Sequence, residues 1–281
     1  MCYNFKKRGG NNLGKIISFA NQKGGVGKTT TCVNLSSFLA FMGKKILLVD
    51  MDPQGNASSG VGIEKRKDTK TMYNVICEDC EIADAIQKTH INNMDIIPAT
   101  VDLAVAEIDL VQMQSREHVV KKILNKVVDD YDFIMLDCPP SLGLITVNSL
   151  TASDSVIIPI QCEFFALEGL TQLMNTIRLI IHHLNPQLQI EGVVMTMKDN
   201  RSNLVAQVSE EVKKFFGAKV FETYIPRNIR LAEAPSHGES IVTYDINSKG
   251  ADAYLALAEE FLGRNGITFD KFNKKQLKEK K

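Results

Sequence analysis

The sequence predicts an α/β fold: a doubly wound, mostly parallel β-sheet with helices on both faces. Two observations predict it. Short apolar runs alternate with longer segments of helical periodicity from Lys15 to about Gly263, and most of the apolar runs are continuous. A strand that is covered on both faces has this continuous pattern, and strand–helix alternation implies right-handed βαβ units. We find no internal repeat and no Pro/Ser/Gly-rich linker, so we expect one domain over residues 15–263.

Seven strands are expected, each an apolar, β-rich run: residues 16–20, 46–50, 95–98, 133–137, 156–160, 190–196 and 220–225. The clearest helical segments span residues 28–41, 115–128, 167–184, 204–216 and 251–262. In such a sheet, ligands bind where strands end and helices begin. The residues that directly follow each strand are therefore the first place to look for a site.

The composition is that of an ordinary globular protein, which we expect in the cytoplasm. Of 281 residues, 44% are hydrophobic and 23% charged, which excludes collagen-like, low-complexity and disordered classes. Residues 1–15 are polar and cationic and lack the apolar segment of a signal peptide. No stretch approaches the roughly 18 apolar residues of a membrane helix. The cysteines have no disulfide framework spacing, so we expect free thiols.

Charge is spread unevenly along the chain, although 33 basic residues balance 33 acidic ones. Residues 1–15 carry four basic side chains and no acidic one, and residues 264–281 carry seven basic against two acidic. The body between them therefore has nine more acidic than basic residues. Zero net charge alone argues against a nucleic-acid partner, whereas this distribution requires any anion-binding surface to be local.

A glycine-rich loop follows the first expected strand, with the sequence Asn21-Gln22-Lys23-Gly24-Gly25-Val26-Gly27-Lys28-Thr29-Thr30. Its glycines allow a tight turn that aims backbone N–H groups at one point. The helix that follows adds its partial positive charge, and Lys28 and Thr29 supply an ammonium and a magnesium-binding hydroxyl. A strict P-loop has glycine where this chain has Gln22, and an additional lysine, Lys23, opens the loop. The pattern predicts binding of nucleotide phosphates.

The run KGGVGKT, residues 23–29, resembles the deviant Walker A box of the ParA/MinD superfamily of P-loop ATPases. In that superfamily the first lysine reaches across a dimer interface to the partner subunit's nucleotide. The resemblance implies that Lys28 acts in cis and Lys23 in trans, as an arginine finger does, and that activity requires an ATP-sandwich homodimer. It also implies that ATP contacts the whole loop: Lys23, Gly24, Gly25, Val26, Gly27, Lys28, Thr29 and Thr30.

Two aspartates follow the second expected strand. A carboxylate at a strand end beside the phosphate loop can hold Mg²⁺ or orient the attacking water, although a helix or turn cap is the alternative for either residue alone. The segment VDMDPQGN, residues 49–56, resembles switch I of the ParA/Soj proteins. The resemblance implies that Asp52 positions the hydrolytic water and that Asp50 supports the nucleotide site close to the metal.

The expected strand 133–137 has the form of a Walker B strand, an apolar run that ends in Asp137. An aspartate there can accept a hydrogen bond from a magnesium-bound water or from the Thr29 hydroxyl. Many α/β strands end in aspartate, so the register with the phosphate loop is what assigns Asp137, with Thr29, to the magnesium site. The turn that follows, CPPSLG at residues 138–143, resembles switch II.

A polar loop follows the expected strand 220–225, and loops in this position commonly read a nucleobase. Its sequence, IPRNIRLAEAPSHG, resembles a block of the ParA/Soj proteins whose proline and asparagine border the adenine. The resemblance assigns that role to Pro226 and Asn228 and implies ATP rather than GTP. The chain departs from the block at Ala232, where serine is usual, and at residues 239–240, where a basic residue and proline often stand.

Partition ATPases bind DNA nonspecifically in their ATP state through arginines on the dimer surface, and the matching positions here are Arg201 and Arg230. Such contacts are salt-sensitive and independent of base sequence. Without the resemblance, a lone surface arginine is more often solvated or ion-paired. Lys213, Lys214 and Lys219 could widen the patch, but the solvated face of a helix is the better interpretation of these lysines.

Two other features favour different functions. The pair Cys77 and Cys80 has the spacing of an iron–sulfur ligand pair, yet it stands alone before the third expected strand, so we expect thiols without a cluster. A membrane-surface ATPase similar to MinD would end in an amphipathic helix. The apolar residues of the C-terminal segment form no single helical stripe. We therefore expect residues 264–281 to be a basic, disordered tail, and residues 1–14 to be a basic extension.

The four blocks occur in the family's order over residues 15–263, and the chain is identified as a member of the ParA/Soj type. The resemblance implies an ATPase that drives chromosome or plasmid segregation and associates with the nucleoid in its ATP state. Its expected partner is a ParB/Spo0J-like centromere-binding protein. The alternative is a MinD-like positioning ATPase on a membrane surface, although we expect no stable membrane association.

Overall fold

The computed structural model describes residues 7–8, 11–12, 14–163, 166–198 and 203–270. The strands are β1 (Lys7–Arg8), β2 (Asn11–Asn12), β3 (Lys15–Phe19), β4 (Ile46–Asp50), β5 (Gln87–Lys88), β6 (Met94–Ile97), β7 (Phe133–Asp137), β8 (Ser155–Gln161) and β9 (Gln189–Thr196). The α-helices are α1 (Lys28–Phe41), α2 (Asn56–Gly60), α3 (Met72–Ile76), α4 (Ile82–Ala85), α5 (Leu103–Gln112), α6 (Val119–Leu124), α7 (Leu144–Ala152), α8 (Ala166–His183), α9 (Asn203–Phe216), α10 (Ile229–Glu233), α11 (Ile241–Tyr244) and α12 (Lys249–Arg264). The 3₁₀ helices are η1 (Arg116–His118), η2 (Val128–Asp130), η3 (Gly217–Lys219) and η4 (Ala234–His237).

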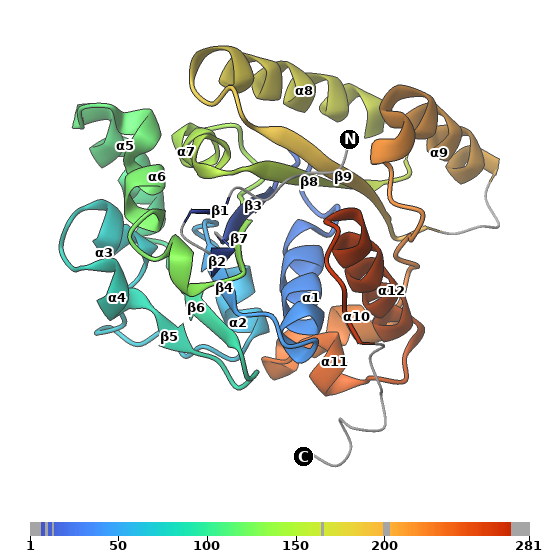
Figure 1. Cartoon of the computed structure of the whole chain (residues 1–281), viewed down its shortest axis with the longest axis horizontal. Coiled ribbons are helices and arrows are strands. Elements are labelled where there is room, and N and C mark those ends of the chain that lie inside the picture. The colour runs from blue at the N-terminus through green and yellow to red at the C-terminus, as the bar shows by residue number, and fades with distance from the viewer. Residues whose placement is uncertain (1–6, 9–10, 13, 164–165, 199–202, 271–281) are drawn as a thin grey trace.

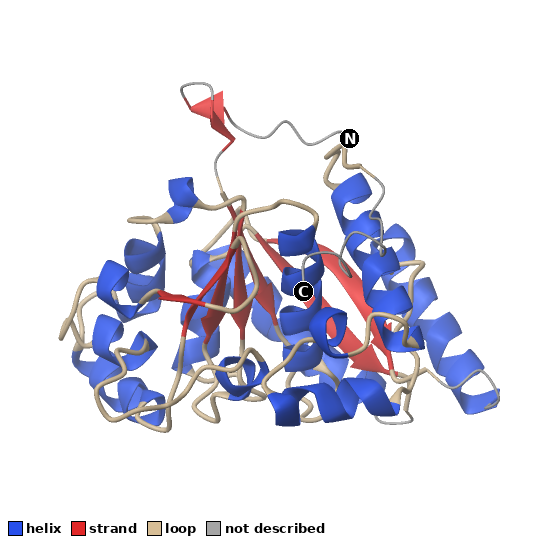
Figure 2. Ribbon diagram, turned by 90° about the horizontal axis from the view of Figure 1, so that it is seen from below, coloured by secondary structure: helices blue, strands red, loops and turns tan. Residues whose placement is uncertain are grey.

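One large sheet organises the molecule. Its strand order is β5-β6-β4-β7-β3-β8-β9, and every neighbouring pair is parallel except β5–β6, which is antiparallel. Helices connect the parallel strands and cover both faces of the sheet (Figure 1). The predicted doubly wound, mostly parallel α/β fold is thus confirmed. β1 and β2 form a separate antiparallel pair that projects from one end of the sheet (Figure 2).

The central strands pack on both faces, which explains their continuous apolar sequences. In β7, Phe133 and Met135 join the core under α1 and α12, while Ile134 and Leu136 join the core under α3, α5, α6 and α7. A third apolar cluster packs α8 and α9 onto β8 and β9. Because helices seal both faces, polar side chains that bind a ligand have to gather at the strand ends.

The segment 220–225, expected as a parallel strand, is not a regular strand. The seventh member of the sheet is instead β5, which the sequence analysis did not predict. Isolated bridges pair Val220 with Val193 of β9, and Pro226, directly after the segment, with Lys198, two residues after β9. Between these bridges, the N–H groups of Glu222 and Thr223 donate to the Glu260 carboxylate of α12 at 2.8 and 2.9 Å. The Glu260 carboxylate accepts the hydrogen bonds that a neighbouring strand would otherwise accept, and this interrupts the β-sheet hydrogen bonding of the segment.

Four of the five expected helices are present with ends that lie within two residues of the expected ones, and the segment 115–128 is the exception. It consists of η1, α6 and η2. The side chain of Asn148 in α7 inserts into its backbone, because Asn148 Oδ1 accepts from Val120 N at 3.2 Å and Nδ2 donates to Arg116 O at 2.8 Å. Those two backbone groups would otherwise bond to each other in a continuous helix.

The packed body continues beyond the expected domain end at residue 263. Asn265 is buried and accepts a hydrogen bond from Lys15 Nζ at 2.7 Å, and Ile267 and Phe269 pack against the main core. The first part of the expected tail therefore belongs to the folded body, whereas residues 271–281 lie outside the described residues. Across the ranges that the structure describes, we find no helix with the length and apolar character needed to cross a membrane.

Candidate functional site

Three strand ends meet at the carboxyl edge of the sheet. The register pairs Phe19 of β3 with Asp137 of β7, and Asp137 with Asp50 of β4. The glycine-rich loop follows β3 directly, so the structure brings the loop and both strand-end aspartates together.

The loop between β3 and α1 has the backbone shape of an anion cradle. Gly25 and Gly27 have φ of 73° and 83°, in the left-handed region that favours glycine. Gly27 is the N-cap of α1, so the first N–H groups of the helix have no carbonyl partner within it. A Cβ added at Gly24 or Gly25 would meet nothing within 4 Å, so the space beside these residues is open. Such a loop suits a phosphate group.

Two polar side chains that the sequence analysis did not single out brace this loop. Asn21 donates to Pro159 O at 2.7 Å and accepts from Lys23 N at 3.0 Å. Thr196, the last residue of β9, donates to Val26 O at 2.7 Å. The available signal for Thr196 was a polar residue at the end of an apolar strand. These bonds brace the loop, and such preorganisation favours binding.

The two lysines of the loop have different surroundings. Lys28 is buried, and its ammonium donates to Lys23 O at 3.2 Å. Burial lowers the pKa of Lys28, while the nearby negative charges, with Asp137 first, act in the opposite direction. The Lys23 ammonium pairs with Glu163 Oε2 at 2.5 Å, and 33% of the Lys23 side chain is exposed. Lys28 thus interacts electrostatically with Asp137 and Asp52, whereas Lys23 forms an ion pair with Glu163.

Asp50 is buried and well supplied with hydrogen bonds. Ser58 of α2 donates to Asp50 Oδ2 through its N–H at 2.8 Å and its hydroxyl at 2.7 Å, and Asp52 N donates to Oδ1 at 3.2 Å. The Ser58 hydroxyl accepts in turn from Ala99 N at 3.1 Å. Burial raises the pKa of Asp50 to about 6 despite these bonds. The fold therefore makes ionisation of Asp50 less favourable than it is in the unfolded chain.

Asp137 is the least satisfied carboxyl of the site. It is completely buried, and neither Oδ1 nor Oδ2 has a well-formed hydrogen bond within the described residues. Burial, followed by the charge of Asp50, raises the pKa of Asp137 well above its usual range, while the nearby Thr29 hydroxyl acts in the opposite direction. Buried polar groups nearly always have partners. The two oxygens are therefore the acceptors that a cation or its bound water would satisfy.

Magnesium fits this arrangement. Mg²⁺ is usually held by one or two protein groups together with waters and substrate phosphates. The described part of the chain contains no group of three or more His, Cys, Asp or Glu side chains that could hold a metal ion by themselves. Asp137 and Thr29, beside the phosphate loop, would supply the protein share of a magnesium site that the nucleotide completes.

Asp52 lies in a turn that several backbone bonds hold. Its Oδ1 accepts from Gln54 N at 2.9 Å, and its carbonyl accepts from Gly55 N at 2.8 Å. Gly55 has φ of 63°, and Lys65 lies against it, with its ammonium donating to Gln54 O at 3.2 Å. Among the described residues, Asp52 Oδ2 makes no hydrogen bond. That oxygen is the one left to accept from a water.

The expected base-binding loop lies beside the phosphate loop. Thr196 at the end of β9 is the nearest group to the position of a Cβ on Gly27, at 3.6 Å. Two residues further on, Lys198 N donates to Ile225 O at 3.0 Å, and Lys198 pairs with Pro226 in an isolated bridge. Pro226 therefore lies at the same edge of the sheet as the phosphate loop.

Asn228 and Arg230 lie together at the start of α10. Asn228 is the N-cap, and its Oδ1 accepts from Arg230 N at 2.9 Å, so one of its polar atoms already has a structural role. Arg230 Nη1 donates to Glu233 at 2.9 Å, and its Nε lies 3.6 Å from Asp245. Arg230 is thus ion-paired, as a lone surface arginine usually is. Arg201 lies outside the described residues.

The cysteine pair has the properties of protonated thiols. Cys77 Sγ donates to Asp109 Oδ2 at 3.4 Å. Burial, together with this hydrogen bond, raises the pKa of Cys77 to about 11, and burial also raises the pKa of Cys80. Both are free cysteines. Metal ligands are thiolates, so this environment disfavours a cluster site.

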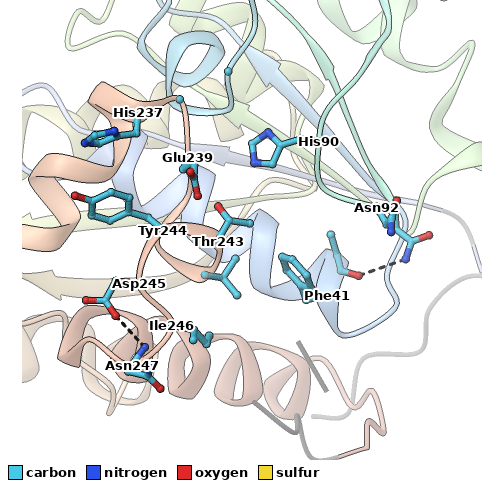
Figure 3. A pocket seen from close by; sticks show the side chains of 15 residues that line it. Phe41, His90, Asn92, His237, Glu239, Thr243, Tyr244, Asp245, Ile246 and Asn247 are labelled. Atoms are coloured by element: carbon cyan, nitrogen blue, oxygen red, sulfur yellow. Dashed lines mark hydrogen bonds between the residues drawn. The ribbon is translucent and has the colours of Figure 1, made fainter. Parts of the chain in front are cut away.

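A separate cavity of about 760 Å³ opens at the far end of α1 (Figure 3). Phe41 borders it, and His90 and His237 approach it from different segments. Because α1 begins at the phosphate loop and has 14 residues, the cavity lies about one helix length, roughly 20 Å, from that loop. Its lining includes Glu239 and Asp245 but no Lys or Arg, so it is unsuited to nucleotide phosphates.

The chain is similar to a known family and to known proteins. The chain matches the family described as an AAA domain, AAA_31, over residues 14–190. It is 59% identical over 248 residues to the sporulation initiation inhibitor protein Soj of Bacillus subtilis, which covers 88% of this chain and 98% of that protein. It is 49% identical over 265 residues to the chromosome partitioning protein ParA of Myxococcus xanthus, which covers 94% of each.

Solved structures resemble the fold over nearly its full length. Cobyrinic acid a,c-diamide synthase from Mycobacterium smegmatis, with bound ADP and magnesium, has a TM-score of 0.78 at 34% identity and covers 93% of this chain and 100% of that one. A putative plasmid partition protein from Borrelia burgdorferi bound to AMPPNP has a TM-score of 0.77 at 27% identity, covering 89% and 99%. The septum site-determining protein MinD of Pyrococcus horikoshii, complexed with Mg-ADP, has a TM-score of 0.74 at 28% identity, covering 88% and 96%.

Proposed function

The chain belongs to the ParA/Soj family of P-loop ATPases, and from that membership we propose that it is a partition ATPase whose ATP-bound dimer binds DNA and whose turnover drives the segregation of a chromosome or plasmid. As an ATPase of this family it uses ATP with Mg²⁺, and similar proteins hold AMPPNP or Mg-ADP. One observation carries the proposal: Asp137, buried and unpartnered, lies in register with the strand that opens a cradle of backbone N–H groups.

The loop and Lys28 would hold the phosphates. The backbone N–H groups of the loop and of the first turn of α1 donate to phosphate oxygens, and the Lys28 ammonium exchanges the Lys23 carbonyl for the nucleotide. A magnesium ion held by Thr29 and Asp137 would neutralise charge on the phosphates. Thr196 and Asn21 keep the loop in place during this exchange.

Asp52 would orient the attacking water. Its Oδ1 is tied to Gln54 N, so the carboxylate is fixed in direction while Oδ2 can accept from a water. Asp50, held by Ser58, supports the same turn through Asp52 N. Pro226 and Asn228 would border the adenine, with Asn228 Nδ2 as the polar atom that the N-cap leaves available.

Lys23 would act on the partner subunit's nucleotide in an ATP-sandwich homodimer. Its ammonium has to leave Glu163 for phosphate when the second copy binds. Both side chains of this ion pair are partly exposed, at 33% and 47%, and such pairs contribute only about 0–1 kcal/mol. The pair can therefore exchange at little cost in free energy, which supports a role in trans.

DNA contact would use Arg201 and Arg230. For Arg230, phosphate has to replace the carboxylates of Glu233 and Asp245, so binding should be weak and salt-sensitive. These arginines would hold the dimer on the nucleoid in the ATP state. A ParB/Spo0J-like centromere-binding protein would be the partner that releases it by stimulating hydrolysis.

Co-sedimentation with ATP tests the proposal against the MinD-like alternative. The protein is mixed with DNA or with anionic vesicles, each with ATP or ADP. We expect it to sediment with DNA in the presence of ATP and to remain in solution with vesicles. Binding to vesicles without binding to DNA would contradict a partition ATPase and favour a membrane-surface one.

Variants separate the individual steps. Asp52→Ala should abolish turnover and leave an ATP-bound dimer, and wild-type turnover would remove the water-positioning role. Lys23→Ala should prevent the dimer, measured by light scattering with ATP. Arg201→Glu combined with Arg230→Glu should lose DNA binding but keep ATP binding. Lys45→Glu, at an exposed position at the opposite end of the sheet, is the control for a change of surface charge.

A further inference from the structure

Helix α5 exposes an apolar stripe that nothing in the described structure covers. Val101, Val105, Ile108 and Val111 are 71, 44, 68 and 52% exposed, and they make up four of the seven large hydrophobic side chains found exposed among the described residues. The spacing of three residues places Val105, Ile108 and Val111 on one face of α5, and Val101 precedes the helix in the turn before its N-cap, Asp102. Clustered exposed apolar side chains of this kind mark interaction sites.

Acidic residues border the stripe on both sides. At roughly 100° per residue, Asp102 and Asp109 fall along one border and Glu107 along the other. Residues 101–112 contain these three acidic side chains and no basic one. Close by, Cys77 contacts Asp109, and the exposed Glu78 follows it in the chain. The surface therefore combines an apolar centre with a negative rim.

The border residue Glu107 connects α5 to the segment that follows Asp137. Its carboxylate lies against Gly143, at a place where a Cβ on Gly143 would collide with it, and its Oε1 accepts from Ile145 N at 3.4 Å. Gly143 is the N-cap of α7, so Glu107 supplies negative charge at that helix N-terminus. A displacement of α5 would therefore change the path of residues 138–143, which begin beside Asp137.

The start of α5 is connected to the other strand-end aspartate. Ala99, two residues before Val101, donates its N–H to the Ser58 hydroxyl, and Ser58 donates to Asp50. The stripe thus begins within a few residues of the hydrogen bonds that hold Asp50. The segment that leads into α5 and the middle of the helix are therefore both connected to the nucleotide site.

The charges of the rim decide between occupants. Twofold packing of this stripe against its copy on a second subunit would bring acidic borders against acidic borders, which is repulsive. A helix with an apolar face and flanking lysines or arginines would satisfy both the stripe and its rim. The stripe runs from residue 101 to residue 111, which is ten residue steps or about 15 Å along a helix axis, and this length suits a partner helix of three turns.

We propose that this α5 stripe is the docking surface for a cationic amphipathic helix of a partner protein, and that docking alters ATP turnover through Glu107. The proposal deepens the function proposed above, because it assigns a surface and a chemistry to the partner that stimulates hydrolysis. The binding step can be tested without ATP, so it does not depend on partition activity.

The probe is a fluorescent peptide of about 12 residues with leucines on one helical face and lysines on its borders, together with the same peptide carrying glutamate for lysine. Binding to the full chain is measured by anisotropy. We expect the lysine peptide to bind and Ile108→Ser to weaken it at least ten-fold, since a buried isoleucine side chain contributes about that factor or more. Leu179→Ser, a control at a 61% exposed site on α8, should leave the affinity unchanged.

Turnover gives the second readout. The lysine peptide should change the ATPase rate of the wild type and of Leu179→Ser but not of Ile108→Ser. Glu107→Gln should still bind the peptide while its rate responds less. The proposal is wrong if the glutamate peptide binds equally well, if Leu179→Ser weakens binding as much as Ile108→Ser, or if Ile108→Ser removes the ATP-dependent dimer in light scattering. If the wild type binds the peptide but shows no ATP turnover, and Ile108→Ser still loses peptide binding, the proposed partition function is wrong while the docking surface is supported.

Discussion

Replacing Asp50 by asparagine should stabilise the protein in the absence of nucleotide and magnesium. Burial raises the pKa of Asp50 from its ordinary value of 3.8 to about 6 in the folded chain. Folding therefore favours the protonated carboxyl, and the stability that it provides is full below the unfolded pKa and is lost as pH rises through about 6. Asparagine keeps the shape of the side chain and removes the charge.

The magnitude follows from the shift. Two pKa units correspond to about 3 kcal/mol at pH 8, where Asp50 is ionised in both states, and to about half of that at pH 5, where the folded form is already mostly protonated. In the variant, an amide N–H group would face Asp52 N, so the 3.2 Å bond from Asp52 N is lost, at about 1 kcal/mol. The asparagine should still accept from Ser58. The net gain is therefore about 2 kcal/mol at pH 8 and less than about 1 kcal/mol at pH 5.

Urea unfolding followed by circular dichroism, in EDTA and without nucleotide, measures this gain at both pH values. Asp132→Asn serves as the control, because its carboxylate accepts from Lys45 N at 2.8 Å at the opposite end of the sheet. Asparagine can still accept from Lys45 N at that position, so the stability of Asp132→Asn should change little, and by a similar amount, at pH 5 and pH 8. A destabilised Asp50→Asn at pH 8, or a gain that does not grow between pH 5 and pH 8, would refute the reasoning.

Three further predictions test other contacts. Glu163→Gln should release Lys23 and strengthen the ATP-dependent dimer by about 1.4-fold to 5-fold for each lysine freed. The measurement is the protein concentration that gives half-maximal turnover. An unchanged concentration would mean that the Lys23–Glu163 pair does not compete with dimer formation. Lys65→Met should loosen the turn that holds Asp52 and lower kcat more than it changes KM for ATP, with Lys65→Arg restoring most of the rate; a KM effect alone would contradict this. Phe261→Ala should cost about 3–5 kcal/mol of unfolding free energy, because Phe261 is completely buried in the α1–α12 core, and a loss below 1 kcal/mol in urea unfolding would contradict that packing.

The sequence was most informative where the chemistry is local in the chain. The glycine-rich loop occupies ten consecutive residues, and its two left-handed glycines are part of the pattern itself. Asp50 and Asp137 were identified because each ends an apolar run, and parallel strands necessarily bring such ends to one edge. The structure pairs these two residues in register.

Other parts of the site could not be read from the sequence because they join residues far apart in it. Thr196 braces Val26 across 170 positions, and Lys23 pairs with Glu163 across 140. A single threonine or glutamate has no local pattern that marks such a contact. The same reason explains the interrupted segment 220–225, since its ladder is broken by one carboxylate of α12.

The sequence by itself therefore determined the layered α/β fold, the phosphate loop and the strand-end aspartates, because apolar periodicity and turn chemistry are properties of neighbouring residues. Only the tertiary structure decided which of those polar groups have hydrogen-bond partners. Asp50 has its partners in Ser58, whereas Asp137 has none among the described residues, although both end the same kind of strand. It also decided that the outer stripe of α5 stays exposed. Periodicity shows which face of a helix is apolar, but long-range packing decides whether another part of the chain covers it.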